Sequence, residues 1–210
     1  MRTILSLGPK GGCGKSSIVR NLAAVAVLEG LRVTTLDTDP QGTVARWHQK
    51  RQRTSAPTIT GFSVDLREAV VAVASARGPD LLLVDTPTAV EVYPEAIKAL
   101  IIAADFVVIP TQPLPDDVDS VHQLMSSVVR DLRRPAMFVV NRAKPRIKEV
   151  ERARGALGRW GDVAAAMIPD SIDVVRAMSA GLGVIETGGK GGIEFRDLWH
   201  EIGRRMGDER

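Results

Sequence analysis

The sequence has few of the features that stabilise secreted or membrane-bound proteins. It contains one cysteine, Cys13, among 210 residues, so it can form neither an internal disulfide nor a cluster that needs two of its own cysteines. No apolar run approaches the roughly 20 residues that cross a membrane, and the first residues resemble a buried strand rather than a secretion signal. Aromatic residues make up only 4% of the chain, too few for a surface on which the bases of a single strand could stack. We therefore expect a cytoplasmic protein.

The remaining composition is that of an ordinary globular protein. Hydrophobic residues make up 44% and charged residues 25% of the sequence. A chain of 210 residues can bury a sizeable core, so we expect a single domain over residues 1–210. The formal net charge is only +3, so the distribution of the basic residues matters more than their sum.

Residues 9–17 read Pro-Lys-Gly-Gly-Cys-Gly-Lys-Ser-Ser and follow a predicted buried strand. A glycine-rich turn lets successive backbone N–H groups point at one anion, and the start of the next helix adds partial positive charge. The pattern is close to the phosphate-binding loop G-x-x-x-x-G-K-[ST], in which the lysine contacts the terminal phosphates and the hydroxyl residue binds Mg²⁺; here Pro9 replaces the first glycine. We interpret Cys13 as a small spacer. The predicted nucleotide-binding residues of the loop are Gly11, Gly12, Cys13, Gly14, Lys15, Ser16 and Ser17.

Strand and helix patterns alternate along the chain. This predicts an α/β fold, a three-layer α/β/α sandwich with a mostly parallel, twisted sheet. Strands are predicted at residues 3–7, 32–36, 81–84, 105–110, 136–140 and 163–168, and helices at residues 16–29, 43–53, 65–76, 91–103, 116–131, 173–180 and 193–206. Such sheets bind ligands at the carboxyl ends of their strands, so the residues that follow the strands form the candidate site.

Two acidic segments follow predicted strands at this edge. Residues 37–41 read Asp-Thr-Asp-Pro-Gln, and Asp85 follows four apolar residues. A carboxylate at the end of a buried strand beside a phosphate loop can hold Mg²⁺, so Asp85 and Ser16 are predicted metal ligands, and Asp37 would lie near the metal. The alternative for Asp37 and Asp39 is that both only cap the following helix.

An ordinary phosphate loop does not need the early lysine, Lys10. The pattern K-G-G-x-G-K-[ST] resembles the deviant Walker A motif of the ParA/MinD group of dimerising ATPases. Further matches are D-x-D-P-Q at residues 37–41, D-T-P at 85–87 and I-P-x-Q-P at 109–113, so the resemblance covers nearly the whole chain. It is greatest to the small ParA-type partition ATPases, which lack an N-terminal DNA-binding domain. Because the loop starts near residue 9, we expect no such module ahead of it.

The resemblance implies a role for each matched residue. Lys10 of one subunit would reach the nucleotide of its partner, so that ATP binding would stabilise a homodimer; otherwise Lys10 is an ordinary solvated lysine. Lys15 would neutralise phosphate charge and Asp39 would position the attacking water, and hydrolysis would be slow and stimulated by a partner protein. The base would be held by three residues farther along the chain, Asn141, Pro169 and Asp170. Asn141 could alternatively be a turn cap.

Basic residues are concentrated between residues 142 and 159, and a dimer would double them. Such a cluster could contact the phosphates of duplex DNA without reading its bases. The predicted DNA-binding residues are Arg146, Arg152, Arg154, Arg159 and Arg196. The alternative is a set of solvated helix faces. The same two interpretations apply to Arg46, Lys50 and Arg53, which share one helix face and for which we prefer the solvated one.

Together, these inferences predict an ATP hydrolase in the cytoplasm, associated with the nucleoid, that drives plasmid or chromosome partition with a DNA-binding adaptor protein. Positioning of another cargo, such as a chemoreceptor cluster or a microcompartment, would use the same chemistry with a different adaptor. A small-substrate ATP-dependent ligase is a further alternative, in which Lys10 would have no reason to cross a dimer. We expect no MinD-like membrane anchor, because the apolar face of residues 193–206 can dock on the sheet.

Overall fold

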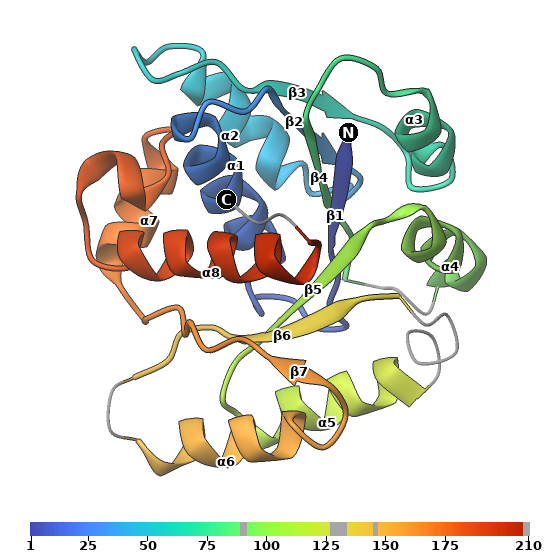
Figure 1. Ribbon diagram of the computed structural model, residues 1–210, viewed down its shortest axis with the longest axis vertical. Coiled ribbons are helices and arrows are strands. Elements are labelled where there is room, and N and C mark those ends of the chain that lie inside the picture. Colours follow the sequence, from blue (N-terminus) through green and yellow to red (C-terminus); the bar gives the residue numbers. More distant parts are fainter. Residues whose placement is uncertain (89–91, 127–133, 145–146, 208–210) are drawn as a thin grey trace.

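The computed structural model describes residues 1–88, 92–126, 134–144 and 147–207 (Figure 1). Seven parallel strands form one sheet in the order β3-β2-β4-β1-β5-β6-β7. The strands are β1 (Arg2–Ser6), β2 (Val33–Asp37), β3 (Thr60–Ser63), β4 (Leu81–Asp85), β5 (Phe106–Thr111), β6 (Ala136–Val140) and β7 (Asp162–Val163). The helices are α1 (Lys15–Leu28), α2 (Thr43–Arg51), α3 (Ala69–Ser75), α4 (Pro94–Ala103), α5 (Pro115–Leu124), α6 (Lys148–Leu157), α7 (Ile172–Ser179), the 3₁₀ helix η4 (Val184–Thr187) and α8 (Gly192–Arg205).

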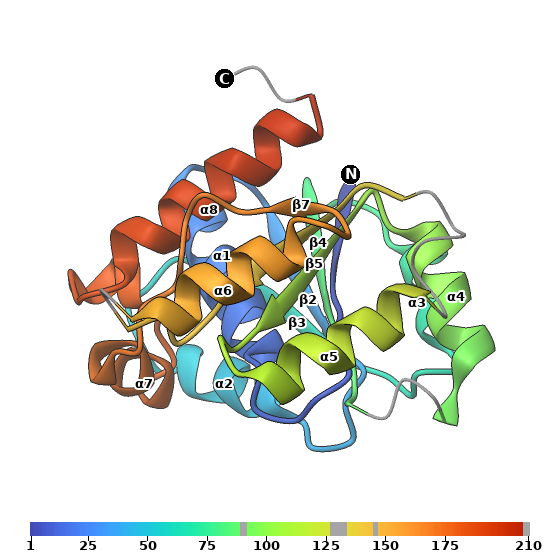
Figure 2. The same cartoon turned by 90° about the horizontal axis from the view of Figure 1, so that it is seen from below.

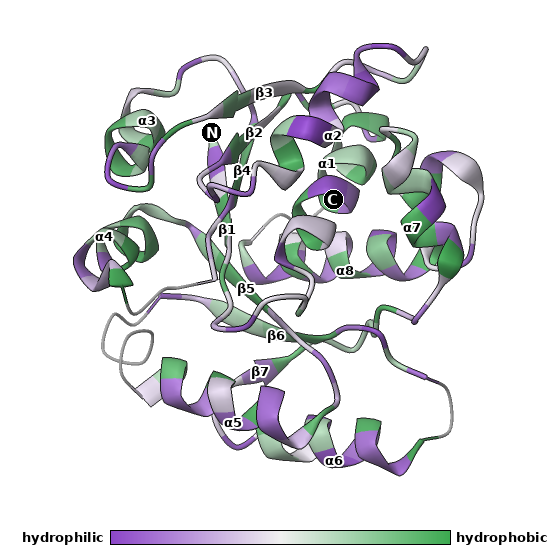
Figure 3. Ribbon diagram, turned by 180° about the vertical axis from the view of Figure 1, so that it is seen from behind, coloured by the Kyte–Doolittle hydropathy of each residue, from purple (hydrophilic) through white to green (hydrophobic). Residues whose placement is uncertain are grey.

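The helices cover both faces of the sheet, which confirms the predicted three-layer α/β/α architecture. Helices α1, α2, α7 and α8 pack on one face, and α3, α4, α5 and α6 on the other (Figures 1 and 2). Strands covered on both faces are rich in apolar residues, and in β4 four apolar residues precede Asp85, with all five buried. Figure 3 shows the converse for the outer helices, where purple, hydrophilic residues alternate with green, hydrophobic ones.

Helix α8 docks on the core, as the sequence predicts. Phe195, Leu198 and Ile202 are fully buried against the sheet and α1. The indole Nε1 of Trp199 donates a hydrogen bond of 2.7 Å to Glu29 at the end of α1, which fixes the two helices together. Within the part of the chain that the structure describes, no helix combines the length and the apolar character that crossing a membrane would take.

The predicted strand over residues 163–168 is wrong in extent, because β7 ends at Val163. The backbone N–H groups of Ala165 and Ala166 donate instead to the carboxylate of Glu201 on α8, at 2.9 and 3.5 Å. A side chain from a distant helix therefore takes the place of a neighbouring strand. This contact has no local signature in the sequence.

Three other differences concern elements that were not predicted and the residue at which an element ends. Strand β3 was not predicted, because its residues are mostly exposed and include Gly61. Helix α6 lies in a segment that we read only for its charge. The predicted helix over residues 116–131 corresponds to α5, which ends at Leu124, and residues 127–131 lie outside the described part of the chain.

The strand register brings the candidate site together. Asp85 pairs in register with Ser6 of β1 and with Asp37 of β2, so the three strands end at the same level. The loop between β1 and α1 starts at this edge. The acidic residues that follow the strands therefore lie next to the glycine-rich loop, as parallel strands require.

Candidate functional site

The phosphate loop depends on glycine at two positions. Gly12 and Gly14 have φ angles of 77° and 113°, which side chains rarely adopt. At Gly14 a Cβ atom would also lie 2.1 Å from Nδ2 of Asn141. The loop is held from β5 as well, since the amide of Gln112 donates to the carbonyl of Gly12 at 3.2 Å. The segment after β5 thus shapes the loop.

Lys15 lies inside the loop, with 5% of the residue exposed. Its Nζ donates to the carbonyl oxygens of Gly8 and Lys10, both at 3.1 Å. These acceptors are neutral, and an anion bound in the loop would be a stronger partner for an ammonium group. The geometry fits the predicted contact between Lys15 and terminal phosphates.

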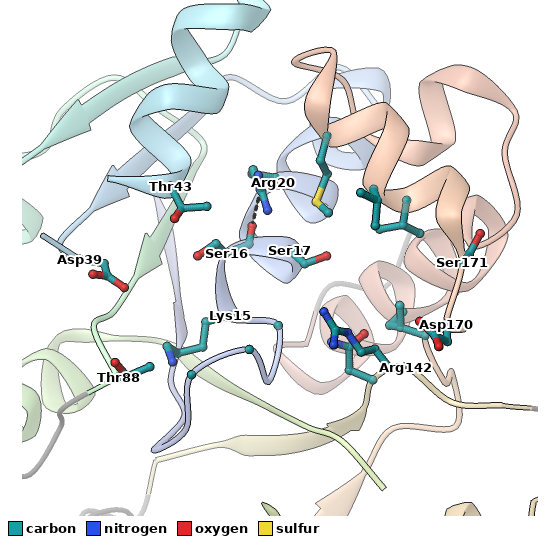
Figure 4. A pocket seen from close by; sticks show the side chains of 18 of the residues that line it. Lys15, Ser16, Ser17, Arg20, Asp39, Thr43, Thr88, Arg142, Asp170 and Ser171 are labelled. Carbon is teal, nitrogen blue, oxygen red and sulfur yellow. Dashed lines mark hydrogen bonds between the residues drawn. The ribbon is translucent and has the colours of Figure 1, made fainter. Parts of the chain in front are cut away.

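A cavity of about 420 Å³ opens in front of the loop, between α1, α2 and α7 (Figure 4). It brings together ten of the residues predicted from the sequence, namely Gly11, Gly12, Gly14, Lys15, Ser16, Ser17, Asp39, Asn141, Pro169 and Asp170. Backbone N–H groups at a helix start and a buried lysine on one wall favour phosphate groups. The opposite wall, which includes Val174, Val175 and Met178, is apolar and suits a base.

Asp85 is the clearest candidate for holding a cation. Its side chain is fully buried, and neither carboxylate oxygen has a hydrogen-bond partner. Burial raises the pKa of Asp85 to about 7; the hydroxyl of Ser16 opposes that rise, and the negative charge of Asp37 adds to it. A buried carboxylate without a partner is costly unless a cation compensates it. Asp85 and Ser16, which lines the cavity, would therefore hold Mg²⁺, which supplies charge neutralisation for the phosphates when bound.

No group of three or more His, Cys, Asp or Glu side chains arranged to bind a metal is found among the described residues. This agrees with Mg²⁺ chemistry, because Mg²⁺ in nucleotide sites takes one or two protein ligands and completes its shell with phosphate oxygens and water.

Asp37 has a structural role in the turn that follows β2. Its Oδ1 accepts the backbone N–H of Asp39 at 3.1 Å, and its Oδ2 accepts that of Ala45 at 2.8 Å. Asp37 therefore caps the turn and the start of α2, which is the alternative that the sequence left open. Whether Asp37 also lies near the metal stays a prediction. Asp39, in contrast, lines the cavity.

Asn141 touches the loop as well as the cavity. Its Nδ2 donates to the carbonyl of Cys13 at 2.8 Å, which leaves the amide oxygen as an acceptor. Recognition of adenine by Asn141 stays a prediction, and this orientation suits it because the amino group of adenine is a donor. The side chain of Cys13 is buried behind the loop and is absent from the lining of the cavity. Burial raises the pKa of its thiol, which supports a spacer rather than a reactive cysteine.

Lys10 does not line the cavity. Its Nζ lies 3.2 Å from Oδ1 of Asp117 in α5, and the Lys10 side chain is 37% exposed. Asp117 is mostly buried, and its Oδ2 has no hydrogen-bond partner. In this single chain, Lys10 is therefore held at the rim of the loop by an intramolecular ion pair.

Six polar residues of the cavity were missed as site residues: Arg20, Gln41, Thr43, Thr88, Arg142 and Ser171. Arg20 lies one helical turn after Ser16, and its Nε donates to the Ser16 carbonyl at 2.9 Å, so helical spacing could have revealed it. Arg142 has a φ of 51°, a conformation that is uncommon for residues other than glycine. This strain brings Arg142 to the cavity (Figure 4).

The predicted DNA-binding arginines are not equivalent. Arg146 lies outside the described residues. The guanidinium of Arg154 points inward and donates to the Ala164 carbonyl at 2.9 Å, which does not support a contact with DNA. Arg152 lies 3.6 Å from the carboxylate of Glu149 on the same helix. Arg159 and Arg196 are exposed.

The parallel sheet, the glycine-rich loop and the orphaned carboxylate at the end of β4 define the chain as a P-loop nucleoside triphosphatase. Comparison with protein families gives a narrower assignment. The model of the CobQ/CobB/MinD/ParA nucleotide-binding domain matches residues 4–184, and the chain belongs to this family. It is an ATPase of the ParA/MinD type.

Individual relatives agree with this assignment. The chain is 30% identical over 210 residues to the maintenance of carboxysome distribution protein A of Gloeobacter kilaueensis, covering 98% of this chain and 94% of that protein. Two solved structures share the fold. The septum site-determining protein MinD of Pyrococcus horikoshii, complexed with Mg-ADP, superposes with a TM-score of 0.74 at 18% identity over 98% and 97% of the two chains. Apo McdA of Cyanthece gives 0.75 at 17% identity over 96% and 98%.

Proposed function

We propose that this protein is a dimerising ATPase that positions a cargo in the cytoplasm, with residues 1–210 acting as one ATPase domain. Two lysines at opposite ends of one phosphate loop are the observation that supports it. Lys15 is buried in its own cavity, whereas Lys10 lies outside that cavity. A second lysine that does not reach its own nucleotide site is available to another subunit's site.

The residues in and beside one cavity have different roles in hydrolysis. Lys15 and the loop N–H groups bind the terminal phosphates, and Ser16 and Asp85 hold Mg²⁺. Asp39 lies between the phosphate cavity and a second depression that includes Pro87 and Tyr93, so it can orient water that enters from solvent. The side-chain Oδ1 of Asp39 already accepts the backbone N–H of Gln41 at 2.9 Å, which fixes its direction.

ATP would stabilise the dimer by linkage, because a ligand that contacts both subunits favours their association. Each Lys10 would exchange Asp117 for a phosphate of the partner's nucleotide. Hydrolysis would remove this phosphate, Lys10 would return to Asp117, and the dimer would open. Slow turnover would then set the lifetime of the dimer.

The cargo is the less determined part of the proposal. Plasmid or chromosome partition with a DNA-binding adaptor is one possibility, and the relative from Gloeobacter kilaueensis, named for carboxysome distribution, favours a protein microcompartment instead. Both would use an adaptor protein that stimulates hydrolysis, and both would use the nucleoid as a track through non-specific binding of duplex DNA. Turnover that rises with a small carboxylic acid rather than with DNA would instead indicate a ligase.

The experiment that tests the proposal measures molar mass in solution by light scattering with Mg²⁺ and ADP or ATP. The unmodified protein should be monomeric with ADP and form a short-lived dimer with ATP. Asp39→Ala should bind ATP, lose turnover by about 100-fold or more, and form a lasting dimer, because a positioned general base contributes that much. A protein that remains monomeric with ATP in both forms would contradict the proposal. Normal turnover in the variant would mean that another residue positions the water.

A further inference from the structure

A third depression, of about 250 Å³, lies beside the nucleotide cavity, and three cationic side chains line it. Arg20 comes from α1, and Arg46 and Lys50 come from α2, where a spacing of four residues places them on one helix face. We name these three residues the α2 patch. Burial lowers the pKa of the Arg20 guanidinium, the carboxylates of Asp85 and Asp37 oppose that shift, and Arg46 adds to it. Figure 3 shows α2 largely in the purple of hydrophilic residues.

No ion pair joins Arg46 or Lys50 to a carboxylate within the described part of the chain, whereas the negative charges of Asp85 and Asp37 act on Arg20. Residues 40–53 contain no Asp or Glu. Arg51 forms a buried ion pair of 2.7 Å with Glu186 of η4. Arg20 and Arg46 donate to backbone carbonyls, those of Ser16 and Gln41, and neither neutralises their charge. Lys50 of α2 and Arg53, which lies just past the end of the helix, are exposed, so the row of cations continues beyond the helix.

The α6 region, from which DNA binding was predicted, differs in this respect. Arg152 is paired with Glu149, and Arg205 of α8 is paired with Asp162 at 2.9 Å. Lys144 lies 4.0 Å from the carboxylate of Asp170. A phosphate that approached Arg152 or Lys144 would have to displace a carboxylate, whereas one that approached Arg46 or Lys50 would not. Arg154 is bonded to a backbone carbonyl, as Arg20 and Arg46 are, and Arg159 and Arg196 are exposed.

The α2 patch also adjoins the nucleotide. Arg20, Thr43, Val175 and Met178 line both depressions. The hydrogen bond from Arg20 to the Ser16 carbonyl links the patch to the first turn of α1, where the phosphates bind. A ligand on the patch and a nucleotide in the cavity therefore contact opposite sides of the same arginine.

We propose that the α2 patch, rather than α6, binds backbone phosphates of duplex DNA, an assignment that rests on the proposed function. A helix that presents cations at intervals of about 6 Å lies well against a closely spaced row of phosphates. The only aromatic residue that lines the depression among the described residues, Trp47, is buried and donates its Nε1 hydrogen to the Leu182 carbonyl, so it cannot stack on a base. The contact is therefore electrostatic and independent of sequence.

The test uses the full chain with ATP and Mg²⁺ and follows the anisotropy of a labelled duplex of mixed sequence. Arg46→Gln with Lys50→Gln removes two charges from α2, and Arg152→Gln with Arg159→Gln removes two charges from α6 as the matched control. The α2 variant should lose affinity by about tenfold for each cation that contacts a phosphate, and its log–log salt slope should fall by about one for each. The α6 variant should change much less.

Arg46→Lys with Lys50→Arg keeps both charges and should retain most of the affinity, which separates a charge effect from a folding defect. Both charge-removal variants should still bind ATP, because neither Arg46 nor Lys50 lines the nucleotide cavity. Full affinity in the α2 variant together with loss in the α6 variant would overturn the inference and leave the proposed function intact.

Two further outcomes would also overturn it. Failure of the unmodified protein to bind duplex with either ATP or ADP would remove the DNA part of the proposed function along with this inference, while an ATP-dependent dimer would remain. Binding to vesicles that contain anionic lipid, in place of duplex and with the same loss in the α2 variant, would assign the patch to a membrane surface.

Discussion

The two ends of the phosphate loop carry the same residue type in different surroundings. Lys15, at the helix end, is buried, and its Nζ hydrogens are taken up by loop carbonyls. Lys10, at the strand end, lies partly in solvent against Asp117. Lys15 is therefore part of the cavity of its own chain, whereas Lys10 has a temporary partner within its own chain. The difference indicates that Lys15 binds the nucleotide of its own chain and that Lys10 changes its partner when nucleotide is bound.

The largest effect should come from the buried end of the loop. Lys15→Ala removes the only lysine that lines the cavity among the described residues. ATP affinity should fall by at least about 100-fold, because a charge-assisted contact with the terminal phosphates is lost. Isothermal titration calorimetry measures this directly. Near-normal affinity would show that the loop N–H groups alone carry binding and that the two lysines do not differ in this role.

Lys10→Ala should remove ATP-dependent dimerisation and leave ATP binding by the monomer nearly unchanged. ATP affinity of the monomer should stay within about threefold, because Lys10 does not line the cavity. The ATP-dependent dimer should be lost over the range of protein concentration at which the unmodified protein dimerises, as sedimentation velocity would show. A variant that dimerises normally with ATP would remove the distinction on which the proposal depends.

The carboxylate of Asp85, at the end of β4, gives a prediction of how the stability of the protein depends on pH. The pKa of Asp85 is raised to about 7 in the folded chain, mainly by burial, so folding disfavours its charged form. The folded state then binds the extra proton, and stability falls as pH rises from the unfolded-state pKa towards 7. Without Mg²⁺ and nucleotide, Asp85→Asn should stabilise the protein by roughly 4 kcal/mol near pH 8 and by roughly 2 kcal/mol near pH 5.

Thermal melts at the two pH values measure this difference. The same variant should lose the part of its ATP affinity that depends on Mg²⁺, which connects the orphaned carboxylate to the cation. Equal melting shifts at both pH values would mean that folding does not raise the pKa of Asp85 and that its environment has been misjudged.

The smallest effect concerns the partner of Lys10. Asp117→Asn keeps the shape of the side chain but releases Lys10, so the ATP-bound dimer should form at about two- to fivefold lower protein concentration. The effect is modest because the Lys10 side chain is 37% exposed and its ion pair is screened. Asp116→Asn removes the same charge from the same turn of α5 and serves as the control. Equal shifts in both variants would indicate a general charge effect.

Much of the fold and half of the site could be predicted from the sequence, for a physical reason. Buried parallel strands are largely apolar, and the glycine-rich loop has a fixed relation to the strand and helix around it, so most loop residues line the cavity and Asp85 lies at the end of β4 beside them. The contacts that the prediction missed join segments far apart in the sequence. Asp117 is 107 positions from Lys10, and Glu201 reaches the backbone of Ala165.

Asp37 and Arg154 show a second limit of prediction from the sequence. Each has the right residue type for its predicted role, but each is bonded to the backbone of its own chain. Residue type and spacing do not reveal whether a polar group already has a partner. Arg20, which does lie in the cavity, sits in a helix that the sequence reads mainly as apolar.

The central claim is that Lys10 leaves Asp117 for the nucleotide of a second copy of the chain. Its most direct test is a crystal structure of the Asp39→Ala protein with ATP and Mg²⁺. The account predicts a dimer whose two cavities face each other, with each Lys10 Nζ within hydrogen-bond distance of a phosphate bound to the partner subunit. A triphosphate-bound structure in which Lys10 still pairs with Asp117, or in which the cavities face away from each other, would contradict it.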